Sequence, residues 1–149
     1  MSLVEFFVEG TPRPQGSKRG FVRGGRVVLV ENSKFHKEWR KTVADAAKDA
    51  MKSIPRLEGH LLLELDFYFK RPKSHYRTGK YSCELREDAP THHTKTPDLD
   101  KLIRSVDDSL TGIVFEDDSQ VVEVLARKHW AGGWDYTSEG VKVYVKEMV

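Results

Sequence analysis

The sequence predicts a single α+β domain over residues 1–149, in which a mixed, mostly antiparallel sheet packs against two main helices. Three observations support this fold class. Several short stretches place apolar residues at every second position, as strands with one buried face do. Two longer stretches repeat apolar residues at steps of three and four, as amphipathic helices do. A chain of 149 residues is also the usual size of one domain with its own core.

The first third of the chain is predicted to form a strand, a hairpin and a helix. Residues 3–8 alternate between apolar and polar side chains and are typical of a strand. Gly24-Gly25 separates two short β-prone stretches and supplies the positive φ angles that a two-residue hairpin turn needs. Asn32 or Ser33 can cap a helix that runs to about Lys52. Its expected apolar face comprises Phe35, Trp39, Val43, Ala46, Ala47, Ala50 and Met51.

The middle of the chain combines the strongest predicted strand with a long irregular segment. Residues 61–69 place five apolar side chains on one face of a strand. Residues 70–95 show no periodicity and are rich in Pro, Gly, Ser, Thr and basic side chains. A loop of this length inside a compact domain is uncommon. It is either an arm that contacts nucleic acid, since aromatic residues interleave with its basic ones, or a disordered surface insertion. Two further strands are predicted at residues 121–130 and 141–145.

Composition and charge narrow the class of protein. Residues 1–56 carry twelve Lys and Arg against six Asp and Glu, whereas residues 98–149 carry six against eleven. This asymmetry suits a polyanion held near a cation site, although ordinary proteins also show it. Cys83 is the only cysteine, which excludes an intramolecular disulfide and a zinc ribbon. Because no apolar run approaches the roughly 18 residues that span a bilayer and no signal peptide is evident, we expect a cytoplasmic protein without membrane contact.

Residues 96–120 contain seven acidic side chains on a segment that also carries a helix-spaced apolar stripe. Asp98 lies at the start of the predicted helix and Asp100 on its polar face. If the short apolar run at residues 113–115 folds back under the helix, the carboxylate of Asp118 or Asp117 comes close to those of Asp98 and Asp100. Such oxygen ligands suit Mg²⁺ or Mn²⁺. Without a metal, the same residues would be a helix cap, an ordinary turn and an i,i+4 ion pair. The stripe comprises Leu99, Leu102, Ile103, Val106 and Leu110.

This segment resembles the signature of the RusA family of Holliday junction resolvases. The resemblance lies in PDLDKLIR at residues 97–104, then DSLTG at 108–112 and DDSQVV at 117–122. It implies a small homodimeric endonuclease, bacterial and often phage-borne, that cuts four-way DNA junctions symmetrically with Mg²⁺ or Mn²⁺. The essential carboxylates of the family correspond to Asp98, Asp100 and Asp118, and Asp117 is a plausible fourth ligand.

The basic residue of the site departs from the family pattern. The functional lysine of the family corresponds to Arg104, whose planar guanidinium differs from a point ammonium. Lys101 stands where the family usually has asparagine, so it is the other candidate for the catalytic cation.

The predicted partner is branched DNA, held by basic residues of the N-terminal third and of the irregular segment. Two other functions fit the same residues. One is a nuclease for flaps or other structured DNA on the same metal site, and the other is a nucleic-acid-binding protein without catalysis. The candidate phosphate contacts are Arg13, Lys18, Arg19, Arg23, Arg26, Lys70, Arg71, Lys73 and Arg77.

Overall fold

A computed structural model describes residues 2–15, 18–31, 34–132 and 138–149 of the chain. Its two main helices and its strands agree with the predicted α+β class. Three single 3₁₀ turns, at Lys73–His75, Gly79–Tyr81 and Asp118–Gln120, interrupt the connections. The longer elements are β1 (Leu3–Glu9), β2 (Lys18–Arg23), β3 (Arg26–Glu31), α1 (Lys34–Ala50), β4 (Leu61–Phe69), α2 (Leu99–Leu110), β5 (Val121–Trp130) and β6 (Gly140–Glu147).

The main sheet has the strand order β1-β6-β4-β5. The pairs β1–β6 and β6–β4 are antiparallel, whereas β4 and β5 run parallel. Parallel neighbours need a long crossover, and here the irregular segment and α2 provide it. The mixed, mostly antiparallel sheet that the sequence predicts is therefore confirmed. β2 and β3 form a separate two-stranded hairpin.

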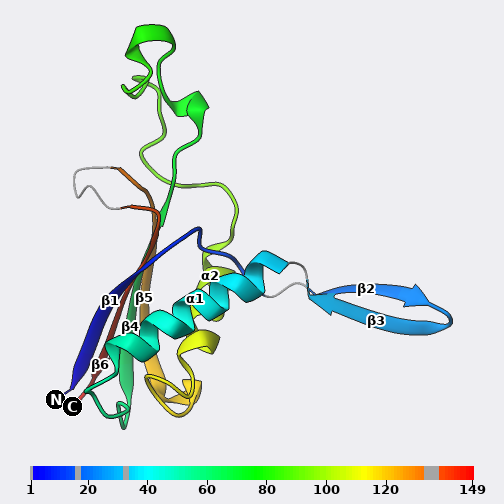
Figure 1. The fold of residues 1–149 in the computed structure, drawn as a ribbon, viewed down its shortest axis with the longest axis vertical. Helices are drawn as coiled ribbons and strands as arrows, with labels where there is room; N and C mark the ends of the chain where they lie inside the picture. Colours follow the sequence, from blue (N-terminus) through cyan, green and yellow to red (C-terminus); the bar gives the residue numbers. More distant parts are fainter. Residues whose placement is uncertain (1, 16–17, 32–33, 133–137) are drawn as a thin grey trace.

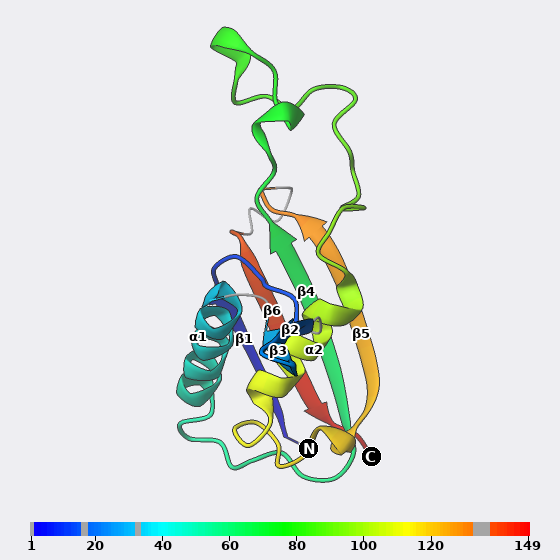
Figure 2. The same ribbon diagram turned by 90° about the vertical axis from the view of Figure 1, so that its right-hand side faces the viewer.

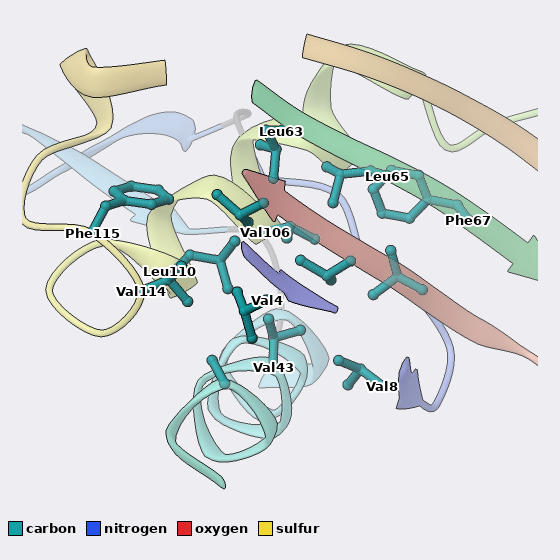
Figure 3. Close-up of a cluster of buried hydrophobic side chains, with 14 of the residues drawn as sticks. Val4, Val8, Val43, Leu63, Leu65, Phe67, Val106, Leu110, Val114 and Phe115 are labelled. Atoms are coloured by element: carbon teal, nitrogen blue, oxygen red, sulfur yellow. The ribbon is translucent and has the colours of Figure 1, made fainter. Parts of the chain in front are cut away.

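Both helices cover the same face of the main sheet and enclose the core (Figures 1 and 2). In Figure 3, Val43 of α1 lies opposite Val4 and Val8 of β1, and the α2 side chains reach the β4 row. The predicted apolar faces of β4 and of the final strand are buried throughout. Phe35 is the exception on α1: it is 56% exposed, because it lies at the start of the helix, where Arg13 rather than the core covers its ring.

The predicted boundaries of α1 need a small correction. The helix ends at Ala50, and residues 51–53 form a turn rather than the last residues of the helix. The predicted caps Asn32 and Ser33 lie outside the described residues. Among the described elements, no helix is long and apolar enough to cross a membrane.

Two projections leave the body of the molecule (Figure 1). One is the β2–β3 hairpin, whose turn residues Gly24 and Gly25 have the predicted positive φ angles of 58° and 77°. The other is the arm, which we define as residues 70–97; it extends beyond one end of the main sheet (Figure 2). The α2 helix begins where the arm returns to the body. The segment that carries the predicted carboxylates therefore starts at the base of the arm.

Candidate active site

Asp98 occupies the N-cap position of α2, but its side chain makes no capping hydrogen bond. Its backbone carbonyl accepts a hydrogen bond from the N–H of Leu102, which starts the helix. The exposed carboxylate instead lies 3.4 Å from the ammonium nitrogen of Lys101. The helix cap that could have explained this residue without a metal is therefore not formed, and the Asp98 carboxylate remains available for a ligand.

Asp100 and Arg104 lie one helical turn apart on the exposed face of α2. The i,i+4 ion pair that could have accounted for both residues is absent from the salt bridges of the described residues, which pair Lys101 with Asp98 instead. Arg104 thus presents an exposed guanidinium, whereas the half-buried Lys101 is engaged with a predicted metal ligand. Of the two candidate cations, Arg104 is the one whose charge the surrounding fold leaves uncompensated.

The chain folds back after α2 as the sequence predicts. The N–H of Gly112, at a φ of 85°, donates to the carbonyl of Phe115, and the N–H of Val114 donates to the carbonyl of Leu110. The side chains of Val114 and Phe115 are fully buried, so this short apolar run anchors the turn in the core. The turn delivers Asp117 and Asp118 to the surface next to the end of α2.

Asp117 and Asp118 differ in how the fold uses them. The Asp117 side chain accepts the N–H of Ser119 at 2.9 Å, and Gln120 completes a capping box with it. These hydrogen bonds lower the pKa of Asp117. Its partner Asp118 has a raised pKa, chiefly through the hydrogen bond it shares with Asp117. Asp117 is thus occupied by turn chemistry, and Asp118 is the freer candidate ligand of the two.

Asp107 and Asp108, at the end of α2, join Asp118 in one acidic group. Burial raises the pKa of Asp107 to about 6, and the charges of Asp118 and Asp108 add to the effect. Asp108 accepts a hydrogen bond from the side-chain amide of Gln15, while the Gln15 backbone N–H donates to the carbonyl of Lys101 at 3.0 Å. The N-terminal basic loop is therefore fastened to α2 between its two acidic ends. Sequence periodicity gave no signal for this contact.

The two acidic ends of α2 remain separate within one chain. Twelve residues form the helix, and at about 1.5 Å per residue its ends lie roughly 18 Å apart. The charge interactions of Asp118 are with Asp107, Asp108 and Asp117. In the described ranges, no group of three or more His, Cys, Asp or Glu side chains is placed to hold a metal ion. The convergence of Asp98, Asp100 and Asp118 on one ion stays a prediction.

The donor chemistry of this segment nevertheless suits a hard divalent cation. Its exposed ligands are all carboxylate oxygens, which Mg²⁺ and Mn²⁺ prefer. Burial is the main cause of the raised pKa of Asp107, and repulsion from Asp118 and Asp108 adds to it. A bound cation would lower that repulsion.

The candidate phosphate contacts on the N-terminal side are distributed along the hairpin. Arg23 and Arg26 are exposed and face each other across the turn, at the end of the hairpin farthest from the body (Figure 1). Arg13 is half-buried, with its guanidinium carbon 5.0 Å from the centre of the Phe35 ring. The side chains of Lys18 and Arg19 lie outside the part of the chain whose side chains the structure describes.

The candidate contacts on the arm divide into free and engaged side chains. Lys70 and Lys73 are exposed. Arg77 forms an ion pair of 2.6 Å with Glu84 and stacks over Tyr81 at 4.1 Å. Arg71 donates to the backbone carbonyl of Pro90 at 2.7 Å, so it links the outgoing and returning segments of the arm.

The base of the arm is held by a cluster of aromatic and histidine rings that no sequence pattern predicts, which we call the Trp130 cluster. The His93 ring stacks on Trp130 with a centroid distance of 4.1 Å, and His75 meets it edge-on at 4.9 Å. Arg71 lies 5.6 Å from the same ring. Phe69, at the end of β4, also contacts the His93 ring in an edge-to-face arrangement, with a centroid distance of 4.7 Å. The only sequence signal was the gathering of His and Trp in irregular segments, which carries no information on spatial contact.

Comparison with known proteins gives two matches. A family model described as endodeoxyribonuclease RusA matches residues 9–145. The uncharacterized protein YqaN of Bacillus subtilis (strain 168) is 30% identical over 133 residues, which cover 88% of this chain and 90% of the relative. The family match contains the hairpin, the arm and the whole acidic segment.

Proposed function

Because this chain belongs to the RusA family of endodeoxyribonucleases, we propose that it resolves four-way DNA junctions by paired, symmetric hydrolysis of two phosphodiester bonds. We further propose that it acts as a homodimer and uses Mg²⁺, with Mn²⁺ as a substitute. A two-fold dimer suits a junction of two-fold symmetry, since it places one active site on each of two opposing strands.

The proposal rests mainly on the charged side chains at the start of α2, which are exposed and little used by the fold. The fold uses neither the Asp98 carboxylate as a cap nor Asp100 and Arg104 as an ion pair. Three charged groups are thus presented to solvent in a segment that the family match includes. Of these, Asp98 pairs only with Lys101, and Asp100 and Arg104 take part in none of the ion pairs of the described residues. Exposed charges that the fold uses so little are typical of binding and catalytic sites on rigid elements.

The roles of these residues follow from the needs of phosphodiester hydrolysis. Asp98, Asp100 and Asp118, which the fold keeps apart within one chain, would have to approach one another to hold the divalent ion. When bound, the ion supplies charge neutralisation and an activated water. Arg104 would donate to a phosphate oxygen as negative charge develops there. Lys101, close to Asp98, would orient that carboxylate and support the same charge from the side.

The two projections support the assignment of DNA as the substrate. The hairpin carries Arg23 and Arg26, and the arm carries Lys70 and Lys73, all exposed. Figure 1 shows that the hairpin leaves the body beside one end of α1, whereas the arm leaves it in another direction at the end of the main sheet. A branched molecule can contact both at once, whereas a single straight duplex would follow one of them. Because phosphate contacts release counterions, we expect binding to weaken steeply with salt.

The test compares Asp98→Asn, Asp100→Asn and Asp118→Asn with the wild type on a labelled four-way junction. Each variant should lose Mg²⁺-dependent nicking by a factor of about 10³ or more, consistent with the loss of one essential group. Junction binding should persist or tighten, because a repulsive charge is removed from the phosphate site. Asp49→Asn, a change to an exposed carboxylate on α1, is the matched control and should cut normally.

The substrate class is tested in the same assay with flap and duplex DNA. Preference for the four-way junction by the wild-type protein supports resolution. Equal cutting of flaps would assign a broader nuclease, and tight binding without metal-dependent scission would assign a binding protein. Full Mg²⁺-dependent cleavage by all three Asp variants would refute the proposed site.

A further inference from the structure

The outer edge of β5 combines an unpaired strand edge with exposed apolar side chains. β5 pairs with β4 on one side only, and Figure 2 shows no other described element beyond it. Val122, Val124 and Leu125 are 63%, 45% and 45% exposed. A strand of ten residues with a free, apolar edge is a template for pairing with another strand. Monomeric proteins normally protect such an edge, so its state here needs an explanation.

The opposite edge of the sheet, on β1, also exposes apolar side chains, Leu3 and Phe7, but its own charged residues are all acidic. β1 carries Glu5 and Glu9 on its solvent-facing side and has no basic residue. Two antiparallel copies of β1 bring like charges together when Glu5, Phe7 or Glu9 lies on the axis, although Glu5 already pairs with Lys142 of β6. β5 carries both signs on its solvent-facing side, namely Glu123 and Arg127. An antiparallel pair with oppositely charged residues across the axis is therefore possible at β5 but not at β1.

The sequence of β5 is complementary to itself in one antiparallel register. In a two-fold pair whose axis is perpendicular to the sheet, opposite residues must point to the same face. With Leu125 on the axis, Glu123 of one copy lies opposite Arg127 of the other, and this pair occurs twice. With Glu123 or Arg127 on the axis, like charges meet. With Val124 or Ala126 on the axis, Glu123 and Arg127 face other residues.

The two charged side chains retain hydrogen-bonding groups for contacts across the axis. Glu123 is exposed, and the hydrogen bonds and ion pairs of the described residues leave it without a partner in its own chain. Arg127 binds Glu64 and Asp66 through Nη1 alone, at 3.1–3.4 Å, which leaves its other N–H groups for an acceptor across the axis. On the core-facing side, Val124 would lie against Ala126 of the second copy.

We propose that two copies of this chain associate through antiparallel pairing of their β5 edges, with Leu125 on the two-fold axis. The interface joins the two four-stranded sheets into one continuous sheet and covers the apolar edge. This inference rests on the proposed function, which includes a homodimer, and adds to it the surface through which the two copies meet. Both α2 helices then lie on the same face of the joined sheet, so one DNA substrate can contact both acidic segments.

The register is tested by a single cysteine on the axis. In a Cys83→Ser background, which removes the exposed native thiol, Leu125→Cys should give a covalent dimer under mild oxidation. Opposite residues of an antiparallel pair have Cα atoms about 4.5–5.5 Å apart, within the range that a disulfide spans. Leu3→Cys, on the other edge strand and 47% exposed, is the matched control and should remain monomeric in a denaturing gel. Equal crosslinking of both variants, or none at position 125, would overturn the proposal.

The contribution of the β5 edge to dimerisation is tested by substitutions that introduce or reverse a charge. Leu125→Glu brings two carboxylates together at the axis and should raise the dimer dissociation constant at least about 100-fold, measured by analytical ultracentrifugation. Glu123→Lys should raise it about tenfold, because it places a cation opposite Arg127. Leu3→Glu should leave it unchanged. A wild-type protein that is monomeric at micromolar concentration, or an unaltered dimer in Leu125→Glu, would contradict the β5 interface.

The interface and the proposed activity can fail independently. A dimer that the Leu125→Cys variant crosslinks but that cuts no DNA would refute the nuclease and retain the interface. A dimer that cuts four-way junctions without such crosslinks would retain the nuclease and refute the interface. The two assays use the same preparations of the full chain.

Discussion

At the scale of single residues, Asp107 links the acidic segment to stability. Burial beside Asp118 and Asp108 raises its pKa to about 6. The folded state therefore holds the proton more tightly than the unfolded state, and the stability it contributes is complete below the unfolded pKa of 3.8 and lost as the pH rises through about 6. Above pH 6 the ionised group costs the folded state about 3 kcal/mol at most.

Replacing this carboxyl by a neutral amide should remove that cost. We expect Asp107→Asn to raise the free energy of unfolding at pH 8 by about 2–3 kcal/mol and to have little effect at pH 4. Urea unfolding across this pH range is the measurement, with Asp49→Asn as the exposed control. A difference from the wild type that does not change between pH 4 and 8 would show that Asp107 is not the group involved.

The contributions of Arg104 and Lys101 to catalysis can be distinguished, because the two side chains have different partners in the fold. Arg104 is exposed and takes part in none of the ion pairs found in the described ranges, whereas Lys101 pairs with Asp98. We expect Arg104→Ala to lower the nicking rate about 100-fold or more, as the removal of one charge-stabilising donor does. Lys101→Ala should lower it about tenfold or less. Single-turnover nicking at saturating Mg²⁺ compares the two, and a larger loss in Lys101→Ala would exchange their roles.

Single residues also show what a sequence pattern can and cannot select. Asp98, Asp100 and Asp118 could be selected because the family signature fixes their spacing, and Gly112 because a helix end needs positive φ. The position of Asp118 relative to the other two could not be predicted. It depends on the length of α2 and on where the buried Phe115 anchors the returning chain, both of which are set by packing.

At the scale of elements, the arm is an irregular segment with a fixed base. The Trp130 cluster holds the arm between β4 and α2, and its central contact is the stack of His93 on Trp130. Burial lowers the pKa of His93, and the nearby charge of Lys128 acts in the same direction. The stability that the neutral ring contributes is thus present above its unfolded pKa of 6.5 and lost as the pH falls through the lower folded value.

We therefore expect the base of the arm to loosen on acidification. The indole N–H signal of Trp130 in two-dimensional NMR should shift or broaden as the pH is lowered from 7.5 to 5, because protonated His93 is disfavoured in the buried stack. His93→Phe keeps an aromatic ring and removes the titration, so this variant should show no such transition. Persistence of the same transition in His93→Phe would assign it to another group, such as His75.

Elements with regular periodicity could be located from the sequence, because burial repeats every two residues in β4 and β6 and every three to four in α1 and α2. The arm carries no such repeat. Its anchoring by Trp130 joins residues far apart in the chain through aromatic contacts, and these leave no local pattern. The same limit explains Phe35, which has the spacing of a core residue but lies beyond the edge of the core.

At the scale of the whole molecule, the fold class could be predicted and the strand order could not. The count and type of elements follow from local periodicity, whereas the placement of β6 between β1 and β4 depends on non-local pairing. The edge position of β5 also follows from this order. Its exposed apolar residues, Val122 and Val124, alternate in the sequence like those of a strand with a buried face, so periodicity alone could not show that they are exposed.

The position of the arm determines what would happen if the chain were cut there. β4 precedes the arm, yet in the sheet it lies between β5 and β6, which both follow it. β1, also before the arm, pairs with β6. A cut at the exposed tip of the arm would therefore leave two fragments whose strands interleave, and they would stay together as a non-covalent complex. The molecule is in this sense a protein that could be divided in two at the arm and reassembled from its halves.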